Sequence, residues 1–267
     1  NEEIFTAWVD DSKPIAALKE YVADVTNEKS ENFIPAEDRI AMFDLDGTLV
    51  NSLADLASST NYALAQFGFP QHDVEEFKML VGDGMPKLIE RALPPENRDD
   101  DTKTKVLQTF LRHYRTHYVD KTTVYEGISQ LLNQLKERNI KIAVVSNKAD
   151  EMTGVVVEKL FGKIFDCVTG KRDGYPTKPD PTLTLQIIEK LGVESQECLF
   201  VGDSGMDMAT AVNSGCVAVG VLWGFRGREE LVKNGAKYIM MPGNAIKRHP
   251  MVEARTEAIR ELAENCE

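Results

Sequence analysis

Hydrophobic and polar residues follow two alternating patterns along most of the chain. Short apolar runs bounded by turn residues occur near residues 40–45, 141–148, 165–168, 198–204, 217–222 and 238–240. Such runs are typical of strands that are buried in a parallel sheet. Between them, apolar residues recur every three or four positions, which predicts helices. Strands that alternate with helices of this length indicate βαβ units, so we predict an α/β fold with a parallel sheet flanked by helices.

Residues 52–125 depart from this alternation. Apolar residues recur at helical spacing from Leu53 until Gly68, and further helical stretches follow at about 72–80, 86–93 and 100–118. No convincing strand pattern interrupts this block. An all-helical block placed directly after the first strand of an α/β sheet indicates an inserted cap domain.

The position of this block divides the chain into four parts. We predict an N-terminal extension at 1–38, a catalytic core formed by 39–51 and 126–245, a helical cap at 52–125 and a C-terminal tail at 246–267. The extension includes a pattern for an amphipathic helix, with Pro14 in its first turn and apolar residues on one side. It carries no evident catalytic residues.

The composition excludes several classes of partner. The chain has 267 residues, of which 31 are Lys or Arg and 43 are Asp or Glu, so its net charge is −12. This acidic balance disfavours nonspecific binding to nucleic acid or to an anionic membrane surface. An anionic substrate would need a local basic site or a metal ion. The four cysteines show no zinc-binding spacing, and we expect buried free thiols.

Two features of the sequence bear on the cellular compartment. No apolar stretch approaches the ~20 residues that a membrane-spanning helix needs. The chain starts at Asn1 without Met, which is compatible with the earlier removal of a targeting segment. We expect a cytoplasmic protein, with export as the alternative, and either a monomer or a homodimer.

Polar side chains follow three of the predicted strands. They are Asp44 and Asp46 after the first strand, Ser146 and Asn147 after the second, and Asp203 and Asp207 after a later one. The carboxyl ends of parallel strands meet at one edge of a sheet, where α/β proteins bind their ligands. Lys178 lies on a proline-marked loop that would join them. Adjacent carboxylates repel unless a proton or a cation lies between them, and Mg²⁺ prefers such oxygen ligands.

Each of these residues also has a structural explanation. An Asp-Gly pair forms turns, Ser146 and Asn147 are suitable helix caps, and Lys178 resembles a solvated loop lysine. Asp207 suits the first turn of a helix. All these explanations would have to hold independently, although the residues fall at strand ends in the order that phosphoryl transfer requires. We therefore favour the functional interpretation.

The string Phe43-Asp44-Leu45-Asp46-Gly47-Thr48-Leu49 resembles the first motif of the haloacid dehalogenase (HAD) superfamily. All four motifs of that superfamily are matched in order over residues 39–242, and the stretch from Asp46 to Leu56 is similar to phosphoglycolate phosphatases. The resemblance implies a Rossmann-like core with a helical cap. It also implies a Mg²⁺-dependent phosphomonoesterase that hydrolyses a small phosphorylated metabolite through an aspartyl-phosphate.

The resemblance also implies catalytic and metal-binding roles. Asp44 would be the nucleophile and a metal ligand. Asp46 would act as acid and base, while its backbone carbonyl ligates the metal. Asp203 would complete the Mg²⁺ ligands, and Asp207 would orient its neighbours from the second shell. Lys178 would offset the charge of the nucleophile and the phosphate. The expected phosphate-binding residues are Gly47, Thr48, Ser146, Asn147 and Lys178.

Substrate choice is expected to depend on the cap. The segment from Gly82 to Pro86 begins a helix whose backbone amides would suit an anion such as a carboxylate. Gly84, Lys87 and Arg91 are the candidate specificity residues, with a hinge and a solvated basic face as the alternative. Asn51 stands where phosphoglycolate phosphatases usually have Asp, a departure that removes a charge and bears on subfamily specificity but not on the reaction.

Four other functions fit parts of the same pattern. The first is a phosphatase whose substrate is a sugar phosphate, a nucleotide or pyrophosphate. The second is a phosphomutase, which would use the same residues without releasing phosphate. A haloacid dehalogenase needs neither metal nor the acid Asp46. A catalytically idle scaffold would use the fold only for binding.

Overall fold

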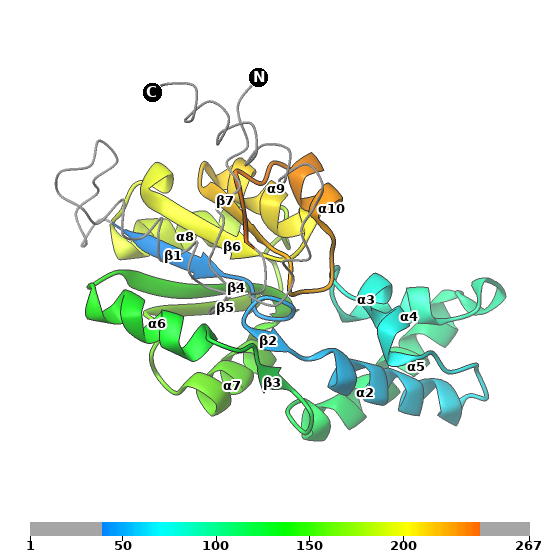
Figure 1. The fold of residues 1–267 in the computed structure, drawn as a ribbon. Helices are drawn as coiled ribbons and strands as arrows, with labels where there is room; N and C mark the ends of the chain where they lie inside the picture. The colour runs from blue at the N-terminus through cyan, green and yellow to red at the C-terminus, as the bar shows by residue number, and fades with distance from the viewer. Residues whose placement is uncertain (1–38, 241–267) are drawn as a thin grey trace, which may run out of the picture.

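The computed structural model describes residues 39–240, shown in Figure 1. Predictions for residues 1–38 and for the tail at 246–267 lie outside the described residues, as does the predicted end of the core at 241–245. Within residues 39–240, no helix is long and apolar enough to cross a membrane.

A six-stranded sheet forms the centre of the larger part of the molecule. Its strands are β5 (Cys167–Lys171), β4 (Lys141–Ala149), β1 (Ile40–Phe43), β6 (Cys198–Gly202), β7 (Val217–Val221) and β8 (Tyr238–Met240), in that order across the sheet. All neighbouring pairs are parallel. Phe43, the last residue of β1, lies opposite Val144 and Val201. The three segments that carry the predicted site therefore leave the sheet at the same edge.

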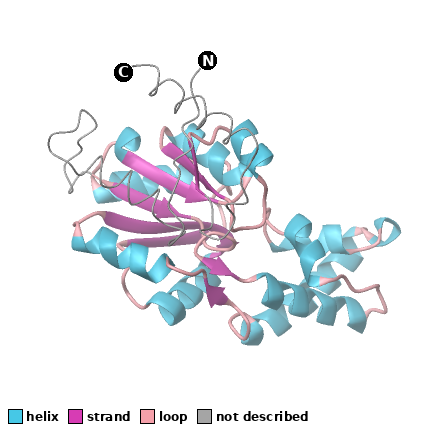
Figure 2. Ribbon diagram, viewed as in Figure 1, coloured by secondary structure: helices cyan, strands magenta, loops and turns pink. Residues whose placement is uncertain are grey.

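Helices cover both faces of this sheet. Side chains alternate between the faces of a strand, and in β1 Ala41 and Phe43 pack on the side of α6 (Ile128–Glu137) and α7 (Asp150–Phe161). Ile40 and Met42 point to the opposite core, which includes α8 (Thr182–Leu191), α9 (Gly205–Ser214) and α10 (Arg228–Lys233). Figure 2 shows the resulting layers. These observations confirm the predicted α/β fold.

The segment between β2 (Val50–Asn51) and β3 (Thr123–Val124) forms a separate helical block beside the sheet (Figure 1). It contains α2 (Leu53–Gln66), α3 (Phe77–Leu80), α4 (Met85–Ala92) and α5 (Asp100–His117), with short 3₁₀ turns at Val74–Glu76 and Pro95–Asn97. A further 3₁₀ turn, Ser195–Glu197, precedes β6. The block has its own buried cluster, which includes Leu64, Phe77, Ile89 and Phe110.

One element contradicts the prediction that no strand occurs between residues 52 and 125. The strand β3 pairs antiparallel with β2, so that Val50 lies opposite Val124 and Asn51 opposite Thr123. This strand has two residues, which is too short to produce a repeating pattern in the sequence. The pair forms the connection through which the chain enters and leaves the helical block.

Candidate active site

The site begins with a tight turn after β1. The amide of Asp44 still donates to Val201 O at 2.9 Å, and the next residues close a loop in which the amides of Leu49 and Val50 both donate to Leu45 O. Gly47 has a φ of 94°, and a Cβ there would collide with the carboxylate of Asp203. Only glycine allows both this conformation and this close approach.

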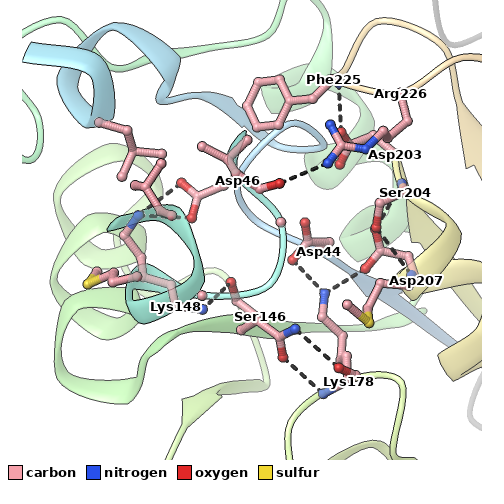
Figure 3. Close-up of a pocket in the computed structure, with 18 residues that line it drawn as sticks. Asp44, Asp46, Ser146, Lys148, Lys178, Asp203, Ser204, Asp207, Phe225 and Arg226 are labelled. Atoms are coloured by element: carbon pink, nitrogen blue, oxygen red, sulfur yellow. Dashed lines mark hydrogen bonds and ion pairs between the residues drawn. The ribbon is translucent and has the colours of Figure 1, made fainter. Parts of the chain in front are cut away.

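The turn directs Asp44 into a buried group of charges (Figure 3). Lys178 Nζ donates to Asp44 Oδ1 at 2.7 Å, to Asp207 Oδ1 at 2.6 Å and to Val145 O at 3.1 Å. Burial alone lowers the pKa of Lys178, but the ion pairs with Asp207 and Asp44 outweigh it and hold this pKa above its usual value. Lys178 is therefore a fixed positive charge against the Asp44 carboxylate.

Negative charge exceeds positive charge in this part of the site. Carboxylate oxygens of Asp44, Asp203 and Asp207 all lie within 4.8 Å of one another. Burial, partly offset by Lys178 and increased by the charges of Asp207 and Asp46, raises the pKa of Asp44 to about 7. Burial and the charges of Asp207 and Asp44 raise the pKa of Asp203 well above its usual range. A cation bound between Asp44 and Asp203 would relieve this repulsion.

Asp207 has its carboxylate committed to protein donors. Its Oδ1 accepts from Lys178, and its Oδ2 accepts from the amide of Ser204 at 3.0 Å and from the Ser204 hydroxyl at 2.6 Å. Ser204 caps α9 and Asp207 is its third helical residue, so the two form a capping box. Asp44 and Asp203 are then the two carboxylates of this group that are better placed to hold a cation.

Ser146 and Asn147 lie where β4 passes the pocket, and both line it. Ser146 Oγ accepts from the Lys148 amide at 3.2 Å. The side chain of Asn147 accepts from the amide of Lys178 at 2.9 Å and donates to its carbonyl at 3.3 Å. Asn147 thus holds the loop that delivers the Lys178 ammonium to Asp44.

Gly47 and Thr48, two of the expected phosphate-binding residues, lie in the loop beneath the pocket. Neither residue lines the pocket. The Gly47 amide donates to Val50 O at 2.8 Å, and the Thr48 hydroxyl donates to Asp203 Oδ1 at 3.1 Å. Both residues therefore act inside the loop, where Thr48 positions the Asp203 carboxylate.

Lys148 was not predicted as a site residue. Its ammonium donates to both carboxylate oxygens of Asp46, at 3.0 and 2.9 Å, and lies 5.1 Å from the ring centre of Tyr114 on α5. Burial by itself lowers the pKa of Lys148, but the charge of Asp46 reverses this and raises it. A lysine two residues after Ser146 gives no sequence signal of its own, because the ammonium of a lysine is usually solvated.

The loop after β7 was also missed as part of the site. Trp223 Nε1 donates to Thr48 O at 2.9 Å, and the amide of Phe225 donates to Asp203 Oδ2 at 2.7 Å. A Cβ at Gly224 would collide with Asp203. The next residue, Arg226, lines the pocket.

Of the three candidate specificity residues, only Gly84 lines the pocket, together with Gly82 and Met85 at the start of α4. Lys87 Nζ pairs with Glu90 at 2.9 Å, and Arg91 pairs with Asp83 and donates to Leu80 O at 3.1 Å. Neither cation is among the residues that line the pocket. Their partners direct them along the surface of the helical block.

The described fold and site match a known class of enzymes. The sequence model of the haloacid dehalogenase-like hydrolases matches residues 41–221. The chain belongs to this family, which confirms the family and the hydrolase class predicted from the motifs.

Particular relatives narrow the comparison. The phosphoglycolate phosphatase of Chromobacterium violaceum is 34% identical over 187 residues, covering 68% of this chain and 84% of the relative. The phosphoglycolate phosphatase of Haemophilus influenzae is 37% identical over 191 residues, covering 68% and 85%. The crystal structure of a predicted phosphoglycolate phosphatase from Haemophilus somnus has a TM-score of 0.72 and 27% identity, covering 79% of this chain and 96% of that one.

Proposed function

We propose that this protein is a Mg²⁺-dependent phosphomonoesterase that acts on a small phosphorylated metabolite through an aspartyl-phosphate. The observation that carries the proposal is the buried group in which Lys178 contacts Asp44, while the Asp203 carboxylate lies within 4.8 Å of it and has no ion-pair partner among the described residues. Phosphoryl transfer is catalysed mainly by positioning and by charge neutralisation, which this group supplies.

The donor set fits Mg²⁺. The Asp44 and Asp203 carboxylates and the backbone carbonyl of Asp46 would hold the ion, since Mg²⁺ takes oxygen ligands and is usually bound by one or two carboxylates together with substrate phosphate. Burial first, and then repulsion from neighbouring carboxylates, raise the pKa values of Asp44 and Asp203, and a bound cation would favour the ionised form of both. The ion would supply neutralisation of the phosphoryl oxygens.

Asp44 and Asp46 divide the reaction between them. A carboxylate oxygen of Asp44 attacks phosphorus, the bond from phosphorus to the ester oxygen breaks, and Asp46 donates its proton to that oxygen. Asp46 then removes a proton from water, the water oxygen attacks phosphorus, and the bond to Asp44 breaks. Inorganic phosphate leaves, and both carboxyl groups return to their starting states. Lys178 holds the attacking carboxylate in place throughout.

Phosphate binding is assigned to Ser146 and Lys178, which line the pocket beside Asp44. Asn147 supports them by fixing the backbone of Lys178. Lys148 orients Asp46, because its ammonium contacts both oxygens of that carboxylate.

The substrate assignment rests on the relatives and on the enclosure of the pocket. Leu56, Val81, Met85 and Leu88 of the helical block line one side of it. Because the helical block closes one side of the pocket, it acts as a cap, and we divide the chain into a core at 39–51 and 126–245 and a cap at 52–125. Phosphoglycolate is the first candidate substrate, since the relatives named above bear that name. Sugar phosphates, nucleotides and pyrophosphate follow.

A phosphate-release assay over these substrates tests the proposal. We expect turnover that needs Mg²⁺, stops with a chelator and is abolished in Asp44→Asn, because the amide cannot act as the nucleophile. Asp101→Asn, which changes an exposed carboxylate on α5 that pairs with Lys105 and does not line the pocket, is the matched control. Phosphate release by Asp44→Asn would refute the mechanism. Formation of a phosphorylated isomer without free phosphate would instead identify a phosphomutase.

A further inference from the structure

Cations that line the pocket differ in how their charge is compensated. Among the described residues these are Lys148, Lys178 and Arg226. Lys148 pairs with Asp46, and Lys178 pairs with Asp44 and Asp207, so both are neutralised by carboxylates of the site. The positive charge of Arg226 has no such buried partner within residues 39–240.

Arg226 is held mainly by backbone carbonyls. Its Nη2 donates to Val81 O at 2.8 Å, its Nη1 donates to Lys78 O, and its Nε lies 3.4 Å from an oxygen of the half-exposed Glu230. A guanidinium has five N–H donors, so two remain for a ligand once these three contacts are counted among the described residues. The carbonyl partners fix the direction of the side chain, and the ion pair with Glu230 uses only Nε, so one N–H on each of Nη1 and Nη2 is left for a ligand among the described contacts.

The backbone places Arg226 close to the proposed metal site. The amide of the preceding Phe225 donates to Asp203 Oδ2, which fixes the loop on that carboxylate. The guanidinium reaches across to the start of the helical block, where a Cβ at Gly82 would lie 3.4 Å from its Nη2. Figure 3 shows Arg226 beside Asp203 at the rim of the space that contains Asp44.

We propose that Arg226 binds a second anionic group of the substrate, which makes the enzyme selective for small phosphate esters that carry a carboxylate. This inference rests on the proposed phosphatase function and assigns its specificity. The Arg fork matches a carboxylate with two parallel hydrogen bonds. Leu56, Val81 and Met85 make this side of the pocket apolar, and an ion pair is stronger where water is excluded.

The same assignment moves the specificity determinant from the helical block to the core. Lys87 and Arg91 are already paired at the surface of the block. Arg226 belongs to the loop after β7. The residues that would bind the phosphate and the one that would bind the carboxylate therefore come from the same edge of the sheet. Two anionic groups on one small molecule would then be held at a fixed separation.

A selectivity ratio tests the proposal. The ratio is kcat/KM for phosphoglycolate divided by kcat/KM for ethyl phosphate, a similar ester in which a methyl group replaces the carboxylate. We expect the wild-type protein to favour phosphoglycolate, and Arg226→Gln to lower the ratio at least 10-fold, mainly through KM for phosphoglycolate. Arg226→Lys keeps the charge but loses the fork, so its ratio should fall less. Lys87→Gln, which removes an exposed cation outside the pocket, should keep the wild-type ratio.

Three results would overturn it. An unchanged ratio in Arg226→Gln, at any absolute rate, would reduce Arg226 to a tie between its loop and residues 78–81. If Arg226→Gln does not fold, an unchanged ratio in Arg226→Lys has the same meaning. Equal use of both esters by the wild-type protein would reject the inference and leave the phosphatase function standing. Hydrolysis of neither ester nor any other phosphate monoester would reject both.

Discussion

At the scale of single residues, the site is a set of buried charges that hold one another in place. Lys178 forms ion pairs with Asp44 and Asp207, and Lys148 forms an ion pair with Asp46. Removing one partner from such a pair leaves an uncompensated charge in a region with little water, which costs more than an exposed pair would. Substitutions here should change both activity and stability.

The raised pKa of Asp44 predicts how stability depends on pH. In the unfolded chain this carboxyl has its ordinary pKa of 3.8, whereas in the fold its pKa is about 7. Between these values the folded protein holds a proton that the unfolded chain has lost, so stability falls as pH rises from about 4 to about 7. Chemical denaturation without metal should show this slope, and Asp44→Asn should reduce it. Parallel profiles for the two proteins would contradict the assignment.

Lys148 should matter for catalysis through Asp46. Lys148→Met keeps most of the volume of the side chain but releases the Asp46 carboxylate, and we expect kcat to fall roughly 10- to 100-fold with a smaller change in KM. Lys148→Arg should recover part of the rate because it can still contact both oxygens. Steady-state kinetics on phosphoglycolate separates these cases, and a full rate in Lys148→Met would show that Asp46 needs no such support.

The residues of this site that belong to a recognisable sequence motif were predicted correctly as a group at one sheet edge. Asp44, Asp46, Ser146, Asn147, Lys178, Asp203 and Asp207 were predicted together, because strand ends of a parallel sheet converge. Lys148 and Arg226 were not predicted, because their partners lie far away in the sequence. Lys148 contacts Asp46, and Arg226 contacts Val81. Charge alone does not tell a buried lysine from a solvated one.

At the scale of elements, the connection to the helical block depends on one buried carboxylate. Asp55 on α2 accepts from the amides of Lys121 and Thr122 and from the Thr122 hydroxyl, with distances between 2.7 and 3.0 Å. These contacts join the start of α2 to the segment just before β3. Asp55 therefore holds together the two chain segments, one after β2 and one before β3, that connect the sheet to the helical block.

Asp55→Ala should destabilise the protein by about 3 kcal/mol, because it leaves buried donors without an acceptor. Asp101→Ala removes a mostly exposed i,i+4 partner of Lys105 and should change stability by less than about 0.5 kcal/mol. Urea denaturation measures both. A loss in Asp55→Ala as small as that of the control would show that the backbone holds the connection without it.

Element prediction was accurate where the hydrophobic pattern was long. The helix α5 at Asp100–His117 and the strand β4 at Lys141–Ala149 lie close to their predicted ranges of 100–118 and 141–148. The strand β5 begins at Cys167 instead of near Phe165. Asp166 explains the shift, since its carboxylate accepts from Ile142 N at 2.8 Å and ends the preceding loop. Such a contact across the sheet has no local signature.

At the scale of the whole molecule, the site lies between the sheet edge and the helical block. Four carboxylates and three cations line the pocket among the described residues, so with all of them ionised a bound Mg²⁺ would change their formal net charge from −1 to +1. This change would favour the approach of an anionic substrate to a protein whose overall charge is negative.

Metal binding should therefore stabilise the fold. A ligand that binds only the folded state adds about 2.7 kcal/mol at 100 times its Kd. We expect Mg²⁺ to raise Tm of the wild-type protein, a chelator to reverse the rise, and Asp203→Asn to abolish it. Asp101 pairs with Lys105 on the surface of α5 and does not line the pocket, so Mg²⁺ should raise Tm of Asp101→Ala as it does for the wild-type protein. An equal rise in Asp203→Asn would place the ion elsewhere.

The proposed mechanism requires that Asp44 is phosphorylated during turnover. Acid quenching during hydrolysis of phosphoglycolate, followed by peptide mass spectrometry, detects this intermediate. We expect a phosphoryl group on the peptide that contains Asp44 and none in Asp44→Asn. A phosphorylated peptide elsewhere in the chain, or steady turnover by Asp44→Asn, would refute the mechanism.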